Sequence, residues 1–277
     1  MTTIAIFGAG GNMGIRASKA LVGDPEYTVL HVEPGEAGVK RLAERQISAM
    51  PPEQAIAQAD TVLFAVPDHL ISRVAADIVP QLNPRTLVIY LDPAAPYHGQ
   101  LPVRDDIASF VTHPAHPPIF NDEQDIEARR DYFGSGLAKQ SIVSALMQGT
   151  EADYAKGEQI SRRMFGPILR SHRLTVEQMA LLEPALAETL AATCLSIIRA
   201  GLDEVISRGV PAEAARDFLM GHLNIETAIL FNEINWKFSQ GCQRAIDAAI
   251  PVIFRPDWKR IFDADELKAS VARIAGG

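Results

Sequence analysis

The chain has 277 residues, of which 47% are hydrophobic, and it carries a formal net charge of −8. This length suits one large domain or two smaller ones, and the composition excludes a disordered chain or a fibre. The acidic balance argues against a nucleic-acid partner, which needs a clustered basic face. No apolar run approaches the roughly 20 residues of a membrane span, so no membrane partner is expected. The chain shows no signal segment and has two cysteines, Cys194 and Cys242, so a cytoplasmic protein is expected.

The first part of the chain alternates strand and helix patterns. Helical segments are expected over 13–21 and 38–45. Buried strands are predicted by apolar runs at 3–7, 28–33, 61–66, 86–91, 109–112 and 141–147. These runs are apolar on both faces, as is typical of parallel strands covered by helices on both sides. We therefore predict an α/β domain with a parallel-type sheet over residues 1–174, in which right-handed crossovers connect the strands.

The pattern changes near residue 175. Segment 175–178 reads as a capping box that opens a helix reaching about residue 208. Pro184 is expected to kink this helix, and its apolar circumference predicts that other protein encloses it. Further helices are expected from about residue 211 and over 222–235, and no strand pattern follows. Residues 175–277 are thus predicted to form an all-helical C-terminal domain.

The strongest local motif is the glycine-rich segment 8–14, between the first strand and the first helix. Glycine there lets a pyrophosphate approach a helix N-terminus, whose free N–H groups bind an anion. The glycine spacing departs from the strict G-x-G-x-x-G, but the position after the first strand favours a Rossmann domain that binds a dinucleotide. The predicted cofactor contacts in this loop are Gly8, Gly10, Gly11, Asn12, Met13 and Gly14.

The second strand ends in Glu33, whose carboxylate can accept hydrogen bonds from the adenosine ribose and repels a 2′-phosphate. This favours NAD over NADP, although Lys40 and Arg41 follow closely and can hold a phosphate. Val66 and Pro67 end the next long strand, where apolar contacts with the cofactor are expected.

Candidates for chemistry lie in both parts of the chain. His113 and His116 belong to a rigid, proline-rich loop after the fifth strand, and they can supply a metal ligand, a general base or both. The alternative is a stiff connector whose histidines only bond to backbone. Glu183 on the apolar helix is costly to enclose unless it is bound to a metal or, alternatively, paired with an arginine. His222 and Glu226 share a helix face, which suits either a functional pair or an ordinary hydrogen bond.

A Rossmann domain followed by a helical domain that opens with one long helix resembles the 6-phosphogluconate dehydrogenase-like superfamily. Proteins with a phosphogluconate dehydrogenase-type C-terminal domain, which include the D-apionate oxidoisomerases, are similar in segments 8–14, 112–118, 182–185, 221–224 and 255–258. The resemblance implies an NAD-dependent oxidoreductase that acts on a small polyhydroxy carboxylic acid, with migration of a carbon group. It also implies a homodimer that forms through the helical substrate and dimerisation domain.

The chain departs from ordinary β-hydroxyacid dehydrogenases because it has no lysine between Lys156 and Lys237. A divalent metal, which can be zinc, manganese or iron, could polarise the substrate oxygens instead. We expect His116 and Glu183, from the two domains, to bind this ion. His113 and His222 are the predicted catalytic residues, with His113 as a general base or an orienting group.

Two alternatives remain at this point. One is a simple hydroxyacid, prephenate-type or imine-type dehydrogenase without rearrangement. The other is a non-catalytic NAD(H) sensor, against which the histidine- and proline-rich loop argues because a sensor needs no such groups beside the nicotinamide.

Overall fold

The computed structural model describes residues 1–275, which divide into two compact units. The first unit comprises Met1–Pro184 together with the chain from Lys268 onward. The second unit is Ala185–Leu267. The boundary thus lies after Pro184, whereas the sequence pattern changes at residues 174–175.

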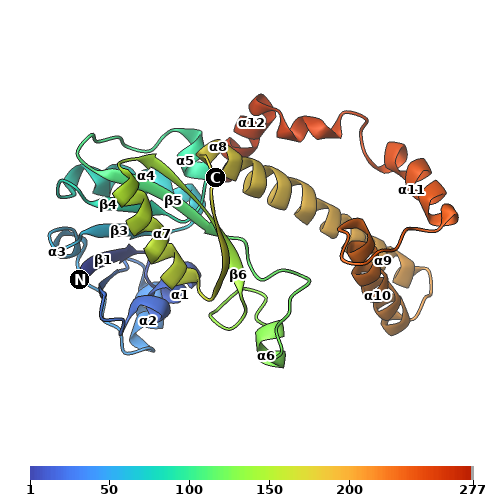
Figure 1. Ribbon diagram of the computed structural model, residues 1–277, viewed down its shortest axis with the longest axis horizontal. Coiled ribbons are helices and arrows are strands. Elements are labelled where there is room, and N and C mark those ends of the chain that lie inside the picture. Colours follow the sequence, from blue (N-terminus) through green and yellow to red (C-terminus); the bar gives the residue numbers. More distant parts are fainter. Residues whose placement is uncertain (276–277) are drawn as a thin grey trace. The chain divides into compact units, whose positions relative to one another are not determined.

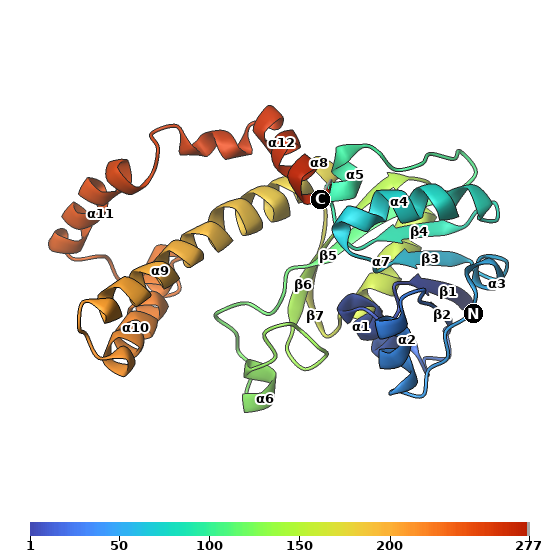
Figure 2. The same ribbon diagram turned by 180° about the vertical axis from the view of Figure 1, so that it is seen from behind.

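The first unit is built around a seven-stranded sheet with the order β2-β1-β3-β4-β5-β6-β7 (Figures 1 and 2). Its strands are β1 Thr2–Phe7, β2 Tyr27–Val32, β3 Thr61–Phe64, β4 Leu87–Tyr90, β5 Ala108–Pro114, β6 Gln140–Gln148 and β7 Ile168–Arg173. The first five strands are parallel, which confirms the predicted α/β architecture. β6 runs antiparallel to β5, and β7 pairs in parallel with β6. The sequence analysis did not identify β7, because this edge strand is polar and largely exposed.

Helices cover both faces of the sheet, as Figure 1 and the reverse view in Figure 2 show. One face packs against α1 Asn12–Leu21, α2 Glu36–Ala43 and α7 Glu151–Phe165. The other face packs against α3 Pro52–Ile56, α4 Asp68–Ile78 and α5 Ala94–His98, with the 3-10 turn η1 Val79–Gln81 after α4. Alternate β1 residues serve the two cores, with Ile4 and Ile6 in the first and Ala5 and Phe7 in the second. The short helix α6 Ile126–Arg129 lies in the long connection between β5 and β6.

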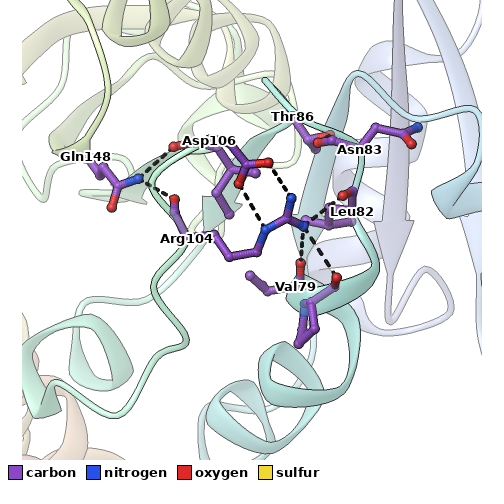
Figure 3. A network of polar contacts seen from close by, with 9 residues as sticks. Val79, Leu82, Asn83, Thr86, Arg104, Asp106 and Gln148 are labelled. Carbon is purple, nitrogen blue, oxygen red and sulfur yellow. Dashed lines mark hydrogen bonds and ion pairs between the residues drawn. The ribbon is translucent and has the colours of Figure 1, made fainter.

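A polar network ties the segment after α4 to the start of β5 (Figure 3). Arg104 Nη1 donates to the carbonyl oxygens of Val79 and Leu82 at 3.0 and 2.7 Å. The same guanidinium pairs with Asp106 at 2.6 Å, and Gln148 Nε2 donates to the Arg104 carbonyl oxygen at 2.6 Å. Carbonyl groups at a helix end need such partners because they have none within the helix. The network therefore fixes the start of the strand that leads into the histidine loop.

The long helix predicted from residue 175 consists of three consecutive segments. They are α8 Val176–Ala180, the π-helical segment η2 Leu181–Ala192 and α9 Thr193–Ser207. The capping box is confirmed, since Thr175 and Gln178 each accept the other's backbone N–H with a side-chain oxygen. Pro184 lies inside the π-helical segment. Because proline has no N–H group for the regular α-helical bond, the α-helical pattern is interrupted around this residue.

The second unit consists of helices without a sheet. Besides α9 it contains α10 Ala212–Leu230, α11 Gln240–Ile253 and η3 Trp258–Phe262, and α12 Ala264–Ala275 begins there. The prediction of a separate helix over 222–235 is wrong, because α10 begins ten residues earlier and runs through this region to Leu230. Helices α9 and α10 pack against each other.

Much of the apolar surface of the second unit is uncovered in the single chain. Among the described residues, neither α9 nor α11 has a buried side chain. The continuous helix Val176–Ser207 is also long and apolar enough, by length and composition alone, to cross a membrane, contrary to the sequence-based expectation. Core helices of soluble proteins can have the same length and composition, so this property does not distinguish a lipid surface from a protein partner.

A buried histidine links α1 to β2 in the first unit. The Nε2 atom of His31 lies 2.7 Å from Ser18 Oγ, and the two residues are 8% and 1% exposed. Burial lowers the pKa of His31, because the interior disfavours the imidazolium. The unfolded chain therefore binds a proton at this residue at a higher pH than the folded chain does.

We expect this difference to make stability depend on pH. As the pH falls below about 6.5, unfolding becomes coupled to proton uptake by His31, so the free energy of unfolding decreases. One such group contributes a slope of at most about 1.4 kcal/mol per pH unit. Urea unfolding between about pH 7 and pH 5 should give a shallower slope for His31→Gln than for the wild-type protein. His172→Gln, on the exposed edge strand β7, controls for the loss of a histidine; equal slopes for His31→Gln and wild type would contradict the assignment.

Candidate active site

Three ionisable side chains meet at the carboxyl ends of β4 and β5. Asp92 follows β4, His113 is the penultimate residue of β5, and Glu183 lies in the first π-helical turn after α8. One potential ligand atom from each residue lies within 4.8 Å of the other two. All three residues belong to the first unit. Ligands of open α/β sheets bind outside this end of the strands, so the cluster occupies the expected position for an active site.

Hydrogen bonds hold the three side chains in place, and one buried carboxylate oxygen of Glu183 has no hydrogen-bond partner among the described residues. The Nδ1 atom of His113 lies 2.8 Å from the Leu91 carbonyl oxygen, and its Nε2 atom lies 2.9 Å from Glu183 Oε1. Asp92 Oδ1 accepts the N–H of Ala94 at 2.7 Å.

The closeness of these groups changes their proton affinities. Burial, together with the neighbouring carboxylates of Glu183 and Asp68, raises the pKa of Asp92 to about 8. Burial by itself lowers the pKa of His113, but the hydrogen bond and charge of Glu183 outweigh it and raise this pKa to about 9. Burial and Glu183 also raise the pKa of Asp68, the first residue of α4. The site is therefore an enclosed group of carboxyls around one imidazole.

This donor set fits a divalent metal ion. Two carboxylates and an imidazole nitrogen are ligands that zinc, manganese and iron accept. The unpartnered Glu183 Oε2 atom is a buried acceptor that such an ion would satisfy. The predicted ligand Glu183 thus lies in a suitable cluster, in which His113 and Asp92 accompany it.

His116 lies beside this cluster but bonds elsewhere. Its Nδ1 atom lies 3.0 Å from the Phe133 carbonyl oxygen, and its ring centroid is 6.2 Å from that of His113. Its backbone has a φ of 59°, in the left-handed region that residues other than glycine rarely adopt. Burial lowers its pKa, and the nearby charges of His113 and Arg16 lower it further. The geometry therefore favours His113 over His116 as the imidazole that would bind the same metal ion as Glu183.

The second predicted catalytic histidine lies in the other unit. His222 is on α10, where its Nδ1 atom lies 2.8 Å from the Phe218 carbonyl oxygen one turn earlier. Its ring stacks on the ring of Phe218 with the centroids 4.0 Å apart. Both contacts are local to α10.

The glycine-rich loop has the geometry of a dinucleotide-binding turn. Gly8 has a φ of 81°, and a Cβ atom there would lie 2.6 Å from the Ala65 carbonyl oxygen. A Cβ atom on Gly14 would lie 2.2 Å from the Gly8 carbonyl oxygen, so β1 and α1 meet too closely for larger residues. Gly11 precedes α1, and no side chain caps the N–H groups of this ten-residue helix, which begins at Asn12. These N–H groups could hold a pyrophosphate, with Gly10 in the turn and Met13 half-buried behind it.

Glu33 holds the same loop from the end of β2. Its Oε2 atom accepts the N–H of Gly10 at 2.9 Å, and its Oε1 atom accepts the N–H of Gly35 at 3.0 Å. Arg41 Nε donates to the Gly10 carbonyl oxygen at 2.6 Å. Each carboxylate oxygen has further acceptor capacity, so Glu33 could also receive ribose hydroxyl groups. Val66 and Pro67 lie between β3 and α4, beside this loop, since a Cβ atom on Gly8 would lie 2.9 Å from Val66 Cγ1.

Comparisons with known proteins agree with this arrangement. Residues 3–95 match the family described as NADP oxidoreductase, coenzyme F420-dependent, and residues 121–275 match the C-terminal family of decarboxylating phosphogluconate dehydrogenase. The D-apionate oxidoisomerase of Rhizobium rhizogenes is 52% identical over 275 residues, covering 99% of this chain and 100% of that protein. The D-apionate oxidoisomerase of Cupriavidus necator is 54% identical over 272 residues and covers 98% of both chains.

The chain belongs to the D-apionate oxidoisomerase family.

A solved structure supports the membership. It is described as a semialdehyde dehydrogenase NAD-binding protein from Cupriavidus necator in complex with calcium and NAD. It is 53% identical and covers 99% of both chains with a TM-score of 0.95. The predicted superfamily is confirmed, and so is the prediction of a nicotinamide-dinucleotide oxidoreductase.

Sequence reasoning missed two carboxyl groups of the candidate site. Asp92 and Asp68 are absent from the predicted site residues, although each lies within four residues of the carboxyl end of a buried strand. An acidic residue at the carboxyl end of a parallel strand was therefore the available signal. Because Pro93 follows Asp92, the pair also fits a simple strand end.

The bonds of Glu33 lead to a prediction about the cofactor. We expect Glu33→Gln to weaken binding of NADH by about 10-fold, because the amide replaces a charged acceptor of the loop and of the ribose. Binding of NADPH should weaken less or improve, because the repulsion of a 2′-phosphate is removed. Fluorescence titration of both cofactors measures this without a substrate. The control is Glu36→Gln, which removes an exposed charge from the start of α2; an unchanged NADH-to-NADPH ratio in Glu33→Gln would contradict the role of Glu33.

Proposed function

We propose that this protein is an NAD-dependent D-apionate oxidoisomerase that uses a divalent metal ion. The observation that carries the proposal is identity above 50% with two D-apionate oxidoisomerases over essentially the whole chain. The cluster of Asp92, His113 and Glu183 supports it, because it offers ionisable groups where an open α/β sheet binds its ligands. The negative charge of Glu33 favours NAD over NADP, because it repels a 2′-phosphate.

The proposed reaction has an oxidation step and a rearrangement step. In the first, the carbon that bears the 2-hydroxyl group of the acid loses a hydride, which NAD accepts when bound, and the hydroxyl oxygen loses a proton. The result is a 2-oxo acid. In the second, a carbon group moves with its bonding electrons from carbon 3 to carbon 2. The hydroxyl on carbon 3 loses its proton and becomes a carbonyl group, while the oxygen on carbon 2 gains a proton.

Both steps need polarised oxygen atoms and a nearby proton acceptor. Asp92, His113 and Glu183 would hold the metal ion, which would polarise neighbouring substrate oxygens as a Lewis acid. The chain has no lysine between Lys156 and Lys237 that could polarise them instead.

His116 is the better placed of the two loop histidines to accept a proton. His113 has both ring nitrogens engaged, one with Leu91 and the other with Glu183. His116 uses only Nδ1, and among residues 1–275 its Nε2 atom has no hydrogen-bond partner. We therefore assign His113 to the metal and His116 to general-base catalysis, the reverse of the sequence-based assignment.

The first test measures turnover by the purified wild-type protein. We expect NADH to form from D-apionate and NAD, and we expect chelator treatment to abolish turnover until zinc, manganese or iron is restored. Carbon NMR of the product distinguishes a rearranged skeleton from an unrearranged 2-oxo acid, which indicates a simple dehydrogenase. Absence of turnover despite NADH binding would contradict the proposed function.

Metal binding can be measured without turnover. Calorimetric titration with each metal alone should show one ion per wild-type chain and at least about 10-fold weaker binding by Asp92→Asn and Glu183→Gln. Asp122→Asn, an exposed carboxylate in the same long loop as His116, should bind the ion like the wild-type protein. Equal affinity of the wild-type protein and the three variants would contradict a metal site at Asp92 and Glu183, without contradicting the dehydrogenase activity.

We also propose that the second unit forms a homodimer. Leu195 and Ile197 on α9 are 58% and 48% exposed, and Val252 and Ile253 on α11 are 83% and 58% exposed. Large apolar side chains exposed on two helices of one unit favour a protein partner, and a second copy of the chain presents the same helices for burial. This extends the prediction that other protein encloses the long helix.

A charged substitution tests the dimer. We expect light scattering to give the mass of two chains for the wild-type protein and a lower mass for Ile197→Glu, because a dimer would bury that charge. The control Val103→Glu alters a side chain of the first unit that is 76% exposed and should leave the mass unchanged. A monomeric wild-type protein that sediments with lipid vesicles would instead assign the apolar helix to a membrane surface.

A further inference from the structure

The histidine loop is anchored to the cofactor-binding helix by one buried arginine. Arg16 lies on α1, two residues beyond the last glycine of the loop, and it is only 7% exposed. Its Nη1 atom donates to the Phe133 carbonyl oxygen at 3.3 Å. That same oxygen accepts the hydrogen bond from His116 Nδ1 at 3.0 Å. One carbonyl group thus connects the guanidinium to the imidazole.

The guanidinium is fixed by stacking as well as by this bond. Its central carbon lies 5.0 Å from the ring centroid of Phe133 and 4.9 Å from that of Phe165. Such cation–π contacts gain strength when the cation is desolvated. Burial also lowers the pKa of Arg16 to about 10, and the charge of Asp131 partly offsets this. Arg16 is therefore a largely buried cation whose guanidinium is held by two aromatic rings and one carbonyl oxygen.

The turn that carries Phe133 is itself rigid. Asp131 accepts backbone N–H groups from Ser135, Leu137 and Ala138 at 2.6, 3.0 and 3.2 Å. Gln140, which is completely buried, donates to the Gly134 carbonyl oxygen at 3.3 Å. These bonds fix the shape of the turn, while the hydrogen bond and ring contact of Arg16 with Phe133 fix its position against α1. The direction of the Phe133 carbonyl group follows from both.

His116 depends on this carbonyl group for its tautomer. A carbonyl oxygen can only accept, so the proton of the neutral ring lies on Nδ1 and the Nε2 atom is left as an acceptor. The backbone of His116 is in the left-handed region, which costs free energy and persists only when its surroundings hold it. Among residues 1–275, the bond to Phe133 is the side-chain hydrogen bond of His116 that can do so.

We propose that Arg16 is a positioning residue that, through the Phe133 carbonyl group, holds His116 in the tautomer and orientation required of the base. This inference rests on the proposed function for the role of His116. The contacts that define it do not depend on that role. Helix α1 would then orient His116 as well as bind the cofactor at its N-terminus.

The experiment compares Arg16→Met with the wild-type protein by two independent measurements. Methionine keeps an unbranched apolar chain between the two phenyl rings but cannot donate to Phe133. Nitrogen-15 NMR of the histidine rings should show His116 with its proton on Nδ1 in the wild-type protein and a mixture of tautomers in the variant. With D-apionate, kcat should fall by about 10- to 100-fold, while KM for NAD changes less than about threefold.

Two further variants control this result. Lys19→Met removes an exposed cation one turn along α1 and should leave the His116 tautomer and kcat as in the wild-type protein. Arg16→Lys keeps a cation between the rings but loses the planar fork, so its kcat and tautomer ratio should fall between the wild type and Arg16→Met. If Arg16→Met does not fold, Arg16→Lys alone carries the test, with the same direction of change.

The possible outcomes separate this inference from the proposed function. An unchanged tautomer in the folded Arg16 variants would overturn the inference, whatever happens to turnover. A fall in kcat that comes with a matching rise in KM for NAD would also overturn it, because Arg16 would then act on the cofactor. If the wild-type protein does not turn over D-apionate, the proposed function fails, and the NMR comparison still decides whether Arg16 holds His116.

Discussion

The contact between His113 and Glu183 is the constraint on which the candidate site depends. It joins the end of β5 to the first π-helical turn, with 2.9 Å between Nε2 and Oε1. Burial lowers the pKa of His113, and the hydrogen bond and charge of Glu183 raise it, so this contact decides the direction of the shift. Asp92 and Asp68 add two carboxyl groups to the same region. The pKa values of His113, Asp92 and Asp68 therefore all depend on the charge of Glu183.

The same contact explains why the start of the long helix belongs to the site. The capping box of Thr175 and Gln178 sets where the helix begins. Glu183 follows eight residues after Thr175, at the point where the α-helical pattern changes to π-helical turns around Pro184. π-Helical segments are often found at functional sites, where the wider turn changes the direction of a side chain. The capping box and the proline thus act together to bring a carboxylate to the ends of the sheet strands.

Much of the fold could be predicted from the chain because its signals are local. Apolar runs with helical segments between them gave the five parallel strands, and the glycines after β1 gave the dinucleotide loop. The direction of β6 is a long-range property, since a connection of 25 residues between Pro114 and Gln140 fits either direction. β7 was missed because an exposed edge strand lacks the buried apolar run that marks the others. The expected division of α10 near residue 222 was wrong, because the helix continues through this position.

The site could be predicted only in part, for a similar reason. Glu183 was identified because a carboxylate on an apolar helix needs a partner. Both loop histidines were identified as well, but their spacing along a proline-rich segment does not say which one faces Glu183. That depends on the left-handed backbone of His116, which turns its ring to the Phe133 carbonyl group. Neither this turn nor the proximity of Asp92 to Glu183 is encoded in a short motif.

The close approach at Gly38 restricts how the cofactor preference of such a chain can change during evolution. A Cβ atom on Gly38 would lie 2.3 Å from Glu33 Cδ, and Glu33 is tethered by two backbone N–H groups. Gly38 also leaves room for Gly10, whose own Cβ atom would lie 2.5 Å from the Gly38 backbone. A lineage acquiring a phosphate-binding side chain at position 38 would first have to lose the acid at position 33. If the substitution at position 38 came first, its Cβ atom would overlap the Glu33 side chain. The effects of the two substitutions therefore depend on each other, and the loss of the acid at position 33 must come first.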